Sequence, residues 1–260
     1  MKQFSSEQSH LIPISSEVRA QLAPHGVLSA AVYLGNFLLV TGRDSSGEPT
    51  GIAPDICRAI AKHLDVRLEL TGYETQDEVV DAAATGKCGI VLVGSDPARA
   101  QKVTFTPAYV ELEATYLVPA NSPIQDISQV DQPGVRIASF FKSAYDHWLQ
   151  RNLKHATLVH ADSVQASNEM FISEHLDALA GLKTGLVTFA NKVPGLRILD
   201  GQFTGIQQGI ATKKTNSEAI RFLSTCVEEF IRSGLVTDLI NQYQVQGLAA
   251  APLHQNSVEK

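Results

Sequence analysis

The chain has 260 residues, which is long for one compact core and comfortable for two lobes of ordinary domain size. Hydrophobic residues make up 44% of it and charged residues 18%, which supports packed interiors and excludes a disordered chain. The formal net charge is -6 and no run of Lys and Arg occurs, so we predict that the protein does not bind nucleic acid.

Signals for targeting or for a membrane are absent from the sequence. Residues 1–20 contain no apolar core of a leader peptide, and no window approaches the roughly 18 apolar residues of a membrane span. We therefore predict no membrane insertion and a cytoplasmic location, with the periplasm as the alternative if a leader has been removed.

The three cysteines, Cys57, Cys88 and Cys226, are far apart and odd in number. This spacing fits neither a disulfide framework nor a zinc site. We predict that all three are buried, and we predict no cofactor and no metal site.

Strands and helices alternate along the first part of the chain. In order, the patterns predict a helix over 15–23, a strand over 27–34, a turn-rich loop over 43–49, a helix beginning near Pro54, a strand over 66–73, a helix ending at Gly86 and a strand over 88–94. The last of these strands, CGIVLVG, is continuously apolar, as strands of a buried parallel sheet are. The alternation predicts an α/β lobe.

The pattern then begins again. A strand over 114–123 leads into a second alternation of helices and strands that extends to about residue 192, so the chain contains two similar α/β units. A strand over 206–214 precedes an amphipathic helix over 217–234, whose apolar face is Ile220, Leu223, Cys226, Val227 and Phe230. A further helix follows at 235–245, and the tail from Leu253 is expected to be loose.

Three segments carry a resemblance to a known family. GEPTGIAPDICRAIAKHL (47–64) has the spacing G-x-x-x-G-x-x-x-D-[IL]. GSDPARAQKVTFTPAY (94–109) resembles T-x-x-R-x-x-x-[VI]-x-F-[ST]-x-P-Y, with Arg99, Val103, Phe105, Thr106 and Tyr109 at the motif spacing and Pro107 one position before the Pro of the motif. EHLDALAGL (174–182) is similar to a G-x-x-D-A element. In this order they resemble the extracellular solute-binding proteins of family 3, the amino-acid-binding members of the type II periplasmic binding fold. The likeness extends from about residue 26 to 247.

The resemblance implies an α/β, two-lobed fold of the periplasmic-binding-protein-like type II, or Venus flytrap, with two hinge strands. The implied boundaries are 1–116 plus 209–260 for lobe 1 and 118–206 for lobe 2, with the hinge near 116–118 and 206–209. The implied function is a solute-binding protein that closes on a small carboxylate-bearing metabolite, such as an amino acid, a keto acid or a dicarboxylate. An ABC transporter permease would be its partner.

Arg99 is the main candidate for binding the ligand. A cleft between two α/β lobes collects helix N-termini and loop N–H groups, which favours an anionic ligand. Arg99 follows the apolar strand by a few residues, and its guanidinium can hold a carboxylate with two parallel hydrogen bonds. In the resembled family the Arg at this position clamps the ligand α-carboxylate. The alternative is a surface Arg that packs over apolar neighbours.

Other residues are expected to complete the carboxylate site. Gly94 and Ser95 lie at the end of the strand, where a backbone N–H and a hydroxyl can bind an anion, although an ordinary turn explains them equally well. The family usually has a Gly-[ST]-[ST] helix start that donates to the same carboxylate. In this chain Lys142 replaces the Gly and Ser143 keeps the hydroxyl. Ser143 can also cap the following helix, and the two roles are compatible.

The opposite end of the predicted site departs from the family. Amino-acid binders of the family place here an Asp that pairs with the ligand ammonium, whereas this chain has Leu182 followed by Lys183. The family also often has, after the first strand, an aromatic residue that stacks on the ligand, and this chain offers Asn36 next to Phe37. Leu accepts no hydrogen bond and Lys repels an ammonium, so the ligand would lack a free amino group or carry a second negative charge. Alternatively, Lys183 faces solvent and Glu111, Glu113 or Asn36 receives the amine.

The hinge strand contributes one further candidate. Because successive side chains alternate across a strand, either Gln207 or Gln208 faces the cleft, and we select Gln207. Tyr109 and Tyr116 are expected in the core rather than in the cleft.

Two competing functions stay open. One is a dehydratase-like enzyme on the same scaffold, for which Glu111, Glu113, Asp146 and Glu174 are the candidate acids. None of them lies in a motif that specifies catalysis, so we predict no catalytic residue. The other is a cytoplasmic ligand sensor, although no DNA-binding helix pair accompanies the fold.

Overall fold

The structure is a computed structural model that describes residues 14–245 and 248–253. Its helices are α1 Ser16–Leu22, α2 Ile52–Leu64, α3 Gln76–Ala84, α4 Pro97–Ala100, α5 Ala144–Asn152, α6 Val164–Ser173, α7 Lys183–Ala190, α8 Ser217–Arg232 and α9 Leu235–Gln242, with a 3-10 turn at Ile127–Gln129. Its strands are β1 Val27–Tyr33, β2 Gly42–Arg43, β3 Pro49–Thr50, β4 Arg67–Tyr73, β5 Ile90–Gly94, β6 Val103–Phe105, β7 Val110–Pro119, β8 Arg136–Phe140, β9 Thr157–Ala161, β10 Ala178–Leu182, β11 Leu196–Ile198, β12 Thr204–Lys213 and β13 Ala249–Ala250.

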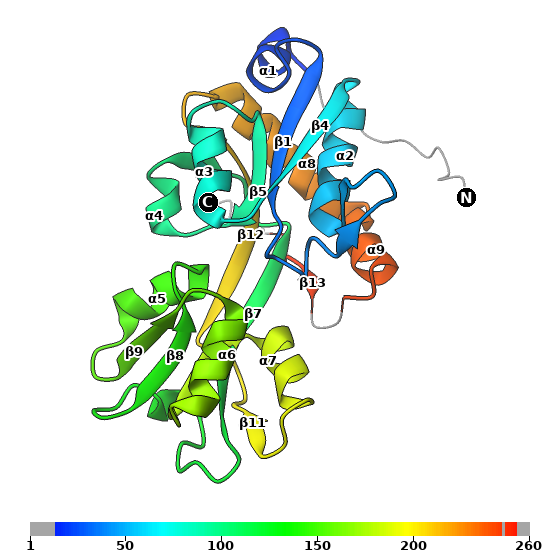
Figure 1. The fold of residues 1–260 in the computed structure, drawn as a ribbon. Coiled ribbons are helices and arrows are strands. Elements are labelled where there is room, and N and C mark those ends of the chain that lie inside the picture. The colour runs from blue at the N-terminus through cyan, green and yellow to red at the C-terminus, as the bar shows by residue number, and fades with distance from the viewer. Residues whose placement is uncertain (1–13, 246–247, 254–260) are drawn as a thin grey trace, which may run out of the picture.

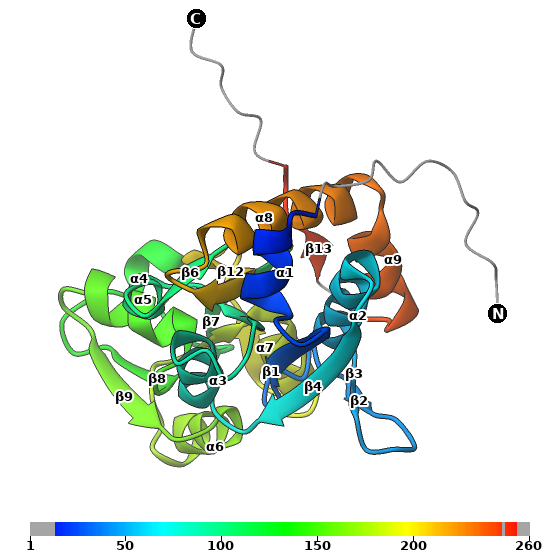
Figure 2. The same cartoon turned by 90° about the horizontal axis from the view of Figure 1, so that it is seen from above.

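The elements gather in two lobes (Figure 1). We call lobe 1 the part that contains β1, β4 and β5 with α1–α4, α8 and α9, and lobe 2 the part that contains β8–β11 with α5–α7. In each lobe the strands pair in parallel, β1 with β4 and β5, and β8 with β9 and β10. Figure 2 shows α8 beside α1 on the outer side of lobe 1, where the two helices pack together. The predicted α/β fold with two lobes is therefore correct.

Two long strands join the lobes. β7 and β12 pair antiparallel from Ala114 with Thr204 to Val110 with Gln208. β12 then continues along β5 of lobe 1, whereas β7 continues along β10 of lobe 2. The result is one continuous sheet in the order β4-β1-β5-β12-β7-β10-β8-β9, with β6, β11 and β13 added to its two long strands. The exact lobe and hinge boundaries named above stay predictions.

Helix α2 begins two residues before the position predicted from Pro54. Gly51 is its N-cap residue with φ of 138°, and Pro54 lies within the first turn. A Cβ atom at Gly51 would lie 2.5 Å from the Leu39 carbonyl oxygen, so the second Gly of the motif is needed for a close approach of two backbone segments.

The core follows the predicted apolar faces in most respects. Tyr109 and Tyr116 are buried, as expected, and all three cysteines are free and buried. Burial raises the pKa of the Cys226 thiol to about 12, so this side chain is a packed apolar group and not a reactive thiolate. In α8 the buried face includes Ala219 and Phe222, and Ile220 is only half-buried.

Several short elements were not predicted. They are β2, β3, β6, β11, β13 and α4, each of four residues or fewer. The tail predicted to be loose lies outside the described residues from 254 onward. Among the described residues, no helix combines the length and apolar character that a membrane crossing requires, and no three His, Cys, Asp or Glu side chains converge as metal ligands would.

Candidate ligand-binding cleft

A pocket opens between the two lobes where both hinge strands pass. Lobe 1 and the hinge contribute Tyr33, Gly35, Asn36, Phe37, Gln76, Val93, Gly94, Leu112, Ile206 and Gln208. Lobe 2 contributes Phe140, Ser143, Ala144, Tyr145, Val164, Ser167, Asn168, Ala180, Gly181, Leu182, Gly185 and Leu186. None of these described lining residues has a charged side chain. A pocket shared by two lobes and a hinge is the usual site of a small ligand.

The polar lining consists of amides and hydroxyl groups. Four amide side chains line the pocket, those of Asn36, Gln76, Asn168 and Gln208. Gln208 is buried, and its Oε1 accepts a hydrogen bond of 3.4 Å from Asn36 Nδ2. Each amide offers both donors and an acceptor, so the lining suits neutral polar groups of either kind.

Gly94 allows the two lobes to approach each other in the floor of the pocket. A Cβ atom at this position would lie 3.1 Å from Gln208 Nε2 and 3.4 Å from the Cβ of Ala144 in lobe 2. The tightest neighbours of such a Cβ would be Gln208 and Ile206 on β12, and a side chain longer than that of Ala would also run into Ala144 of α5.

The mouth of the pocket, unlike its interior, contains charged residues. An outer cavity that shares Tyr33, Phe37 and Phe140 with the pocket is also lined by Glu74, Asp77, Lys142 and Asp162. The ammonium of Lys142 lies 3.3 Å from the Asp77 carboxylate, and this pair links lobe 2 to lobe 1. Three carboxylates against one ammonium make the mouth acidic.

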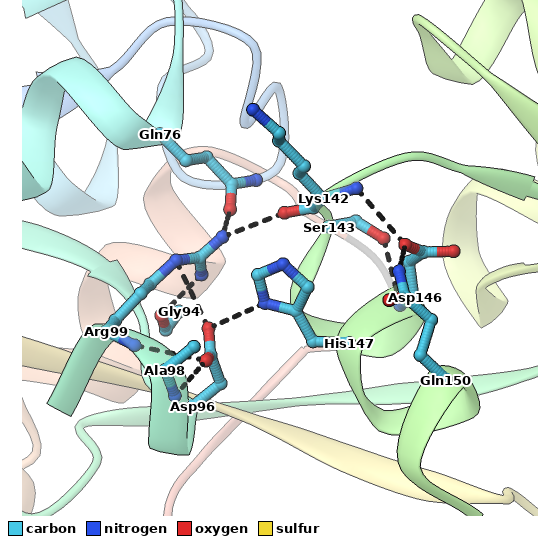
Figure 3. Close-up of polar contacts among 10 residues, drawn as sticks. All are labelled: Gln76, Gly94, Asp96, Ala98, Arg99, Lys142, Ser143, Asp146, His147 and Gln150. Carbon is cyan, nitrogen blue, oxygen red and sulfur yellow. Dashed lines mark hydrogen bonds and ion pairs between the residues drawn. The ribbon is translucent and has the colours of Figure 1, made fainter. Parts of the chain in front are cut away.

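Arg99 lies beneath the pocket and does not line it. Its side chain is 4% exposed, and its guanidinium is held by groups of the protein itself (Figure 3). Nη1 donates to the Gly94 carbonyl oxygen at 2.6 Å, and Nη2 donates to Gln76 Oε1 and, at 3.1 Å, to the Lys142 carbonyl oxygen. Nε lies 3.2 Å from Asp96 Oδ2.

Asp96 has two functions at this point. It is the N-cap residue of α4, and its Oδ1 accepts from the backbone N–H groups of Ala98 and Arg99 at 2.8 and 3.2 Å. Its Oδ2 faces both Arg99 and Nδ1 of His147, which comes from lobe 2 and lies at 3.2 Å. Burial alone would raise the pKa of Asp96, but His147 and Arg99 outweigh it and hold the pKa below its ordinary value. The carboxylate therefore stays ionised beside Arg99.

The N-terminus of α5 also carries an internal carboxylate. Ser143 is the N-cap residue, and its Oγ accepts from the Asp146 backbone N–H at 3.1 Å. The fully buried Asp146 accepts through Oδ2 from the Lys142 backbone N–H at 3.2 Å and from Gln150 Nε2 at 2.5 Å. Lys142 has φ of 61°, the left-handed region in which Gly is the usual residue.

The structure brings four of the eight predicted site residues together in the pocket, namely Asn36, Phe37, Gly94 and Ser143. The other four line neither this pocket nor its mouth. Arg99 is paired as described, and the Ser95 N–H donates to the Gln207 carbonyl oxygen at 2.8 Å. Gln207 Nε2 donates to Glu111, and Lys183 Nζ lies 2.6 Å from Glu113 Oε2.

The choice of Gln207 over Gln208 requires a correction. β12 pairs with β5 and β7 on its two sides, and its alternation directs Gln208 toward the cleft. Gln207 points to the opposite side of the sheet. The alternation identified the pair, but the strand sequence alone does not indicate which member faces inward.

Several lining residues carry no signal in the sequence. Tyr33 ends β1, Gln76 begins α3, Tyr145 lies in α5 and Asn168 in α6. They meet only because the two lobes face each other, and none belongs to a motif. The candidate acids of the enzyme alternative, Glu111, Glu113, Asp146 and Glu174, are not among the lining residues.

Comparison with known proteins identifies the family. The sequence profile of the bacterial extracellular solute-binding proteins, family 3, matches residues 35–246, which is most of the chain. The chain belongs to this family. A search of the curated proteins finds no match.

Solved structures agree with the family fold. A mutant of ArgBP from T. maritima is similar with a TM-score of 0.69 and 19% identity, covering 88% of this chain and 100% of that one. The ancestral amino acid-binding protein AncCDT-1, a precursor of cyclohexadienyl dehydratase, gives a TM-score of 0.69 at 21% identity over 88% and 99%. AbpA from Streptococcus pneumoniae, an amino acid ABC transporter substrate-binding protein solved with L-arginine, gives 0.69 at 19% identity over 87% and 98%. At these identities the likeness concerns the fold.

Proposed function

We propose that this family 3 protein is the solute-binding component of an ABC transporter, and that its lobes close on a small metabolite in the cleft described above. The observation that supports this proposal is the pocket itself, which both lobes and both hinge strands line together. A ligand in this place contacts both lobes only when they are close, so its binding energy favours closure.

Binding without turnover is the function that the lining residues favour. Catalysis of a dehydration needs a general acid within hydrogen-bond reach of the substrate. Glu111 is paired with Gln207, Glu113 with Lys183, and Asp146 with backbone and side-chain donors in the interior of lobe 2. None of these carboxylates faces the pocket among its described lining residues.

The carboxylate-bearing ligand predicted from the sequence is the finer form of this proposal. Arg99 lies directly under Gly94 and Gln76, which both line the pocket. A ligand carboxylate would reach Nη2 of Arg99 only by displacing Gln76 and the Lys142 carbonyl oxygen. Because Arg99 lies next to the pocket, amino acids, keto acids and dicarboxylates are the first compounds to test.

A thermal-shift screen followed by small-angle X-ray scattering tests the proposal. A compound that binds only the folded protein raises the melting temperature, and a closing ligand lowers the radius of gyration. The screen includes amino acids, keto acids, dicarboxylates and their uncharged analogues. If no compound raises the melting temperature, or if NMR shows that the best one is converted to product, the binding function is wrong.

Two neighbouring residues provide a matched test of the site. Gln208→Leu removes a buried amide from the pocket, so we expect it to weaken the best ligand by about tenfold, the value of one or two hydrogen bonds. Gln207→Leu, which changes the same side chain on the other face of β12, should leave the affinity within about twofold. Isothermal titration calorimetry measures both, and equal effects would place the ligand elsewhere.

A further inference from the structure

The guanidinium of Arg99 has no pair of adjacent N–H groups free for a ligand. Nη2 donates to two acceptors, Gln76 Oε1 and the Lys142 carbonyl oxygen, and Nη1 donates to the Gly94 carbonyl oxygen. Nε faces Asp96 Oδ2 at 3.2 Å. A carboxylate held with two parallel hydrogen bonds needs two neighbouring N–H groups, and each such pair already has a member in use.

Gln76 connects this buried guanidinium to the pocket. Its side chain bonds Arg99 and lines the pocket at the same time. Gln76 is half-buried and is the first residue of α3, whose capping box fixes its backbone. Arg99 itself is 4% exposed and does not line the pocket, so its influence on a ligand passes through this amide.

Arg99 decides which end of the Gln76 amide is left for a ligand. A guanidinium has donors only, so the amide atom beside it must be the acceptor Oε1. Figure 3 shows this oxygen directed at Arg99 and the amide nitrogen directed away from it. Among the residues that the structure describes, none accepts a hydrogen bond from Gln76 Nε2. Two N–H donors therefore stay available, and the positive charge behind the amide polarises them.

The same nitrogen of Arg99 brings the start of α5 next to this amide. Nη2 bonds both Gln76 Oε1 and the carbonyl oxygen of Lys142, the residue before the N-cap Ser143. Ser143 and Ala144 line the pocket with Gln76. An anion at Gln76 Nε2 would thus also lie near the positive end of a helix, which favours a carboxylate there.

We infer that Gln76 donates directly to the ligand carboxylate, and that Arg99 is a positioning residue that orients and polarises the Gln76 amide. The inference rests on the proposed function and specifies how its carboxylate-bearing ligand is held. A carboxylate has acceptors only, so it matches the NH2 group that Gln76 presents. In this arrangement the ligand binds without displacing any of the contacts of Arg99.

Gln76→Met separates this arrangement from a direct contact with Arg99. Met has a similar length but no donor, so we expect the affinity for a carboxylate probe to fall at least tenfold. A carboxylate that binds Arg99 directly would instead bind more tightly, because the variant frees Nη2. The probe is the tightest-binding acid of the screen above, which includes L-phenylalanine, L-glutamine, phenylpyruvate and succinate, and calorimetry at pH 7 gives its affinity.

A matched control accompanies this variant. Gln242→Met changes an exposed amide of α9 that does not line the pocket, and it should leave the affinity within about twofold. An unchanged or increased affinity in Gln76→Met overturns the inference.

Gln76→Glu tests the donor itself. Glu can still accept from Arg99, but it replaces the NH2 group by a second oxygen that repels a ligand carboxylate. We expect the ratio of the affinity for the acid probe to the affinity for its primary amide to fall at least tenfold. An equal loss for acid and amide would indicate a packing role and would overturn the inference. If this variant does not fold, the direction of the change in Gln76→Met decides.

The outcomes separate the two proposals. An acid that binds, closes the lobes and is unaffected by Gln76→Met leaves the binding function intact and removes the inference. The same holds if only compounds without a carboxylate bind. If no compound of the screen changes either the melting temperature or the radius of gyration, the binding function itself fails and the inference fails with it.

Discussion

Asp131 is a single residue on which one edge of lobe 2 depends. It precedes β8, and its carboxylate accepts from the backbone N–H groups of Lys154, His155 and Ala156 at 2.9, 2.8 and 2.9 Å. Those residues precede β9, so this carboxylate aligns the starts of two paired strands. Burial would raise the pKa of Asp131, but the three backbone hydrogen bonds lower it below its ordinary value.

The stability that Asp131 contributes should therefore depend on pH. Because its folded-state pKa is lowered, the contribution is complete above the pKa of the unfolded chain and is lost as the pH falls through the folded-state pKa. We expect Asp131→Asn to lower the free energy of unfolding by about 1 kcal/mol at pH 7, with a smaller difference from wild type below pH 4. Urea unfolding at both pH values measures this, with the exposed Asp162→Asn as control. A difference that is constant with pH would contradict it.

For single residues, the sequence indicates which side chain matters better than it indicates which partners that side chain contacts. The motif singles out Arg99 as a ligand-binding residue; in the structure Arg99 lies beneath the pocket, and its part in ligand binding stays a prediction. The pair Asp96-Pro97 is readable as the start of a helix, since Asp is a favoured N-cap residue and Pro a favoured first residue. That the second oxygen of the same carboxylate reaches Arg99, and that His147 approaches it from lobe 2, depends on packing that no local pattern encodes.

Among the elements, α3 connects local helix chemistry to the site. Thr75 and Glu78 form a capping box, in which the Thr75 Oγ1 accepts from the Glu78 N–H at 3.2 Å and the Glu78 carboxylate accepts from the Thr75 N–H at 3.0 Å. The first residue of the helix is Gln76, which lines the pocket and accepts from Arg99. The cap therefore positions a side chain of the site.

Removing this cap should affect stability and binding together. We expect Thr75→Ala to lower the free energy of unfolding by about 1 kcal/mol. It should also lower the affinity for the best ligand by a few-fold, because the first turn of α3, which contains Gln76, is no longer held by the cap. Thr85→Ala, at the other end of α3, is the control and should leave affinity unchanged. Chemical denaturation and calorimetry give the two quantities. Full ligand affinity in Thr75→Ala would show that Gln76 is not positioned by the cap.

Long elements were predictable and short ones were not. The apolar run of β5 and the amphipathic α8 have strong periodic patterns, and both occur where predicted. β13 consists of Ala249–Ala250 and exists because it pairs with β7, so its sequence has no strand pattern of its own. The return of the last helices to lobe 1 was likewise implied only by the resemblance, because periodicity describes elements and not their partners.

At the scale of the whole molecule, polar contacts between described residues cross from one lobe to the other near the cleft. Arg99 donates to the Lys142 carbonyl oxygen, Asp96 faces His147, and the Lys142 ammonium lies 3.3 Å from Asp77. All three favour the closed arrangement in the absence of ligand. The Lys142–Asp77 pair is the most exposed and contributes at most about 1 kcal/mol.

Reversing one charge of the exposed pair should open the ligand-free protein. Asp77→Lys places two ammonium groups together, so we expect the closed population to fall by up to about fivefold, seen as a larger radius of gyration in low-salt scattering. Lys142→Asp should have the same effect, and the double exchange should restore the wild-type value. An additive double variant would mean that the two side chains do not interact across the cleft.

Trp148, the single tryptophan of the chain, lies in α5, whose N-terminus borders the pocket. Its ring is half-buried and lies 5.4 Å from that of Phe203, which leads into the hinge strand β12 and in turn lies 4.5 Å from Tyr116 on β7. Any movement of α5 relative to the hinge changes the surroundings of this one indole. The protein therefore contains its own optical reporter, whose fluorescence emission should follow opening and closing in real time without a label, and should disappear in Trp148→Phe.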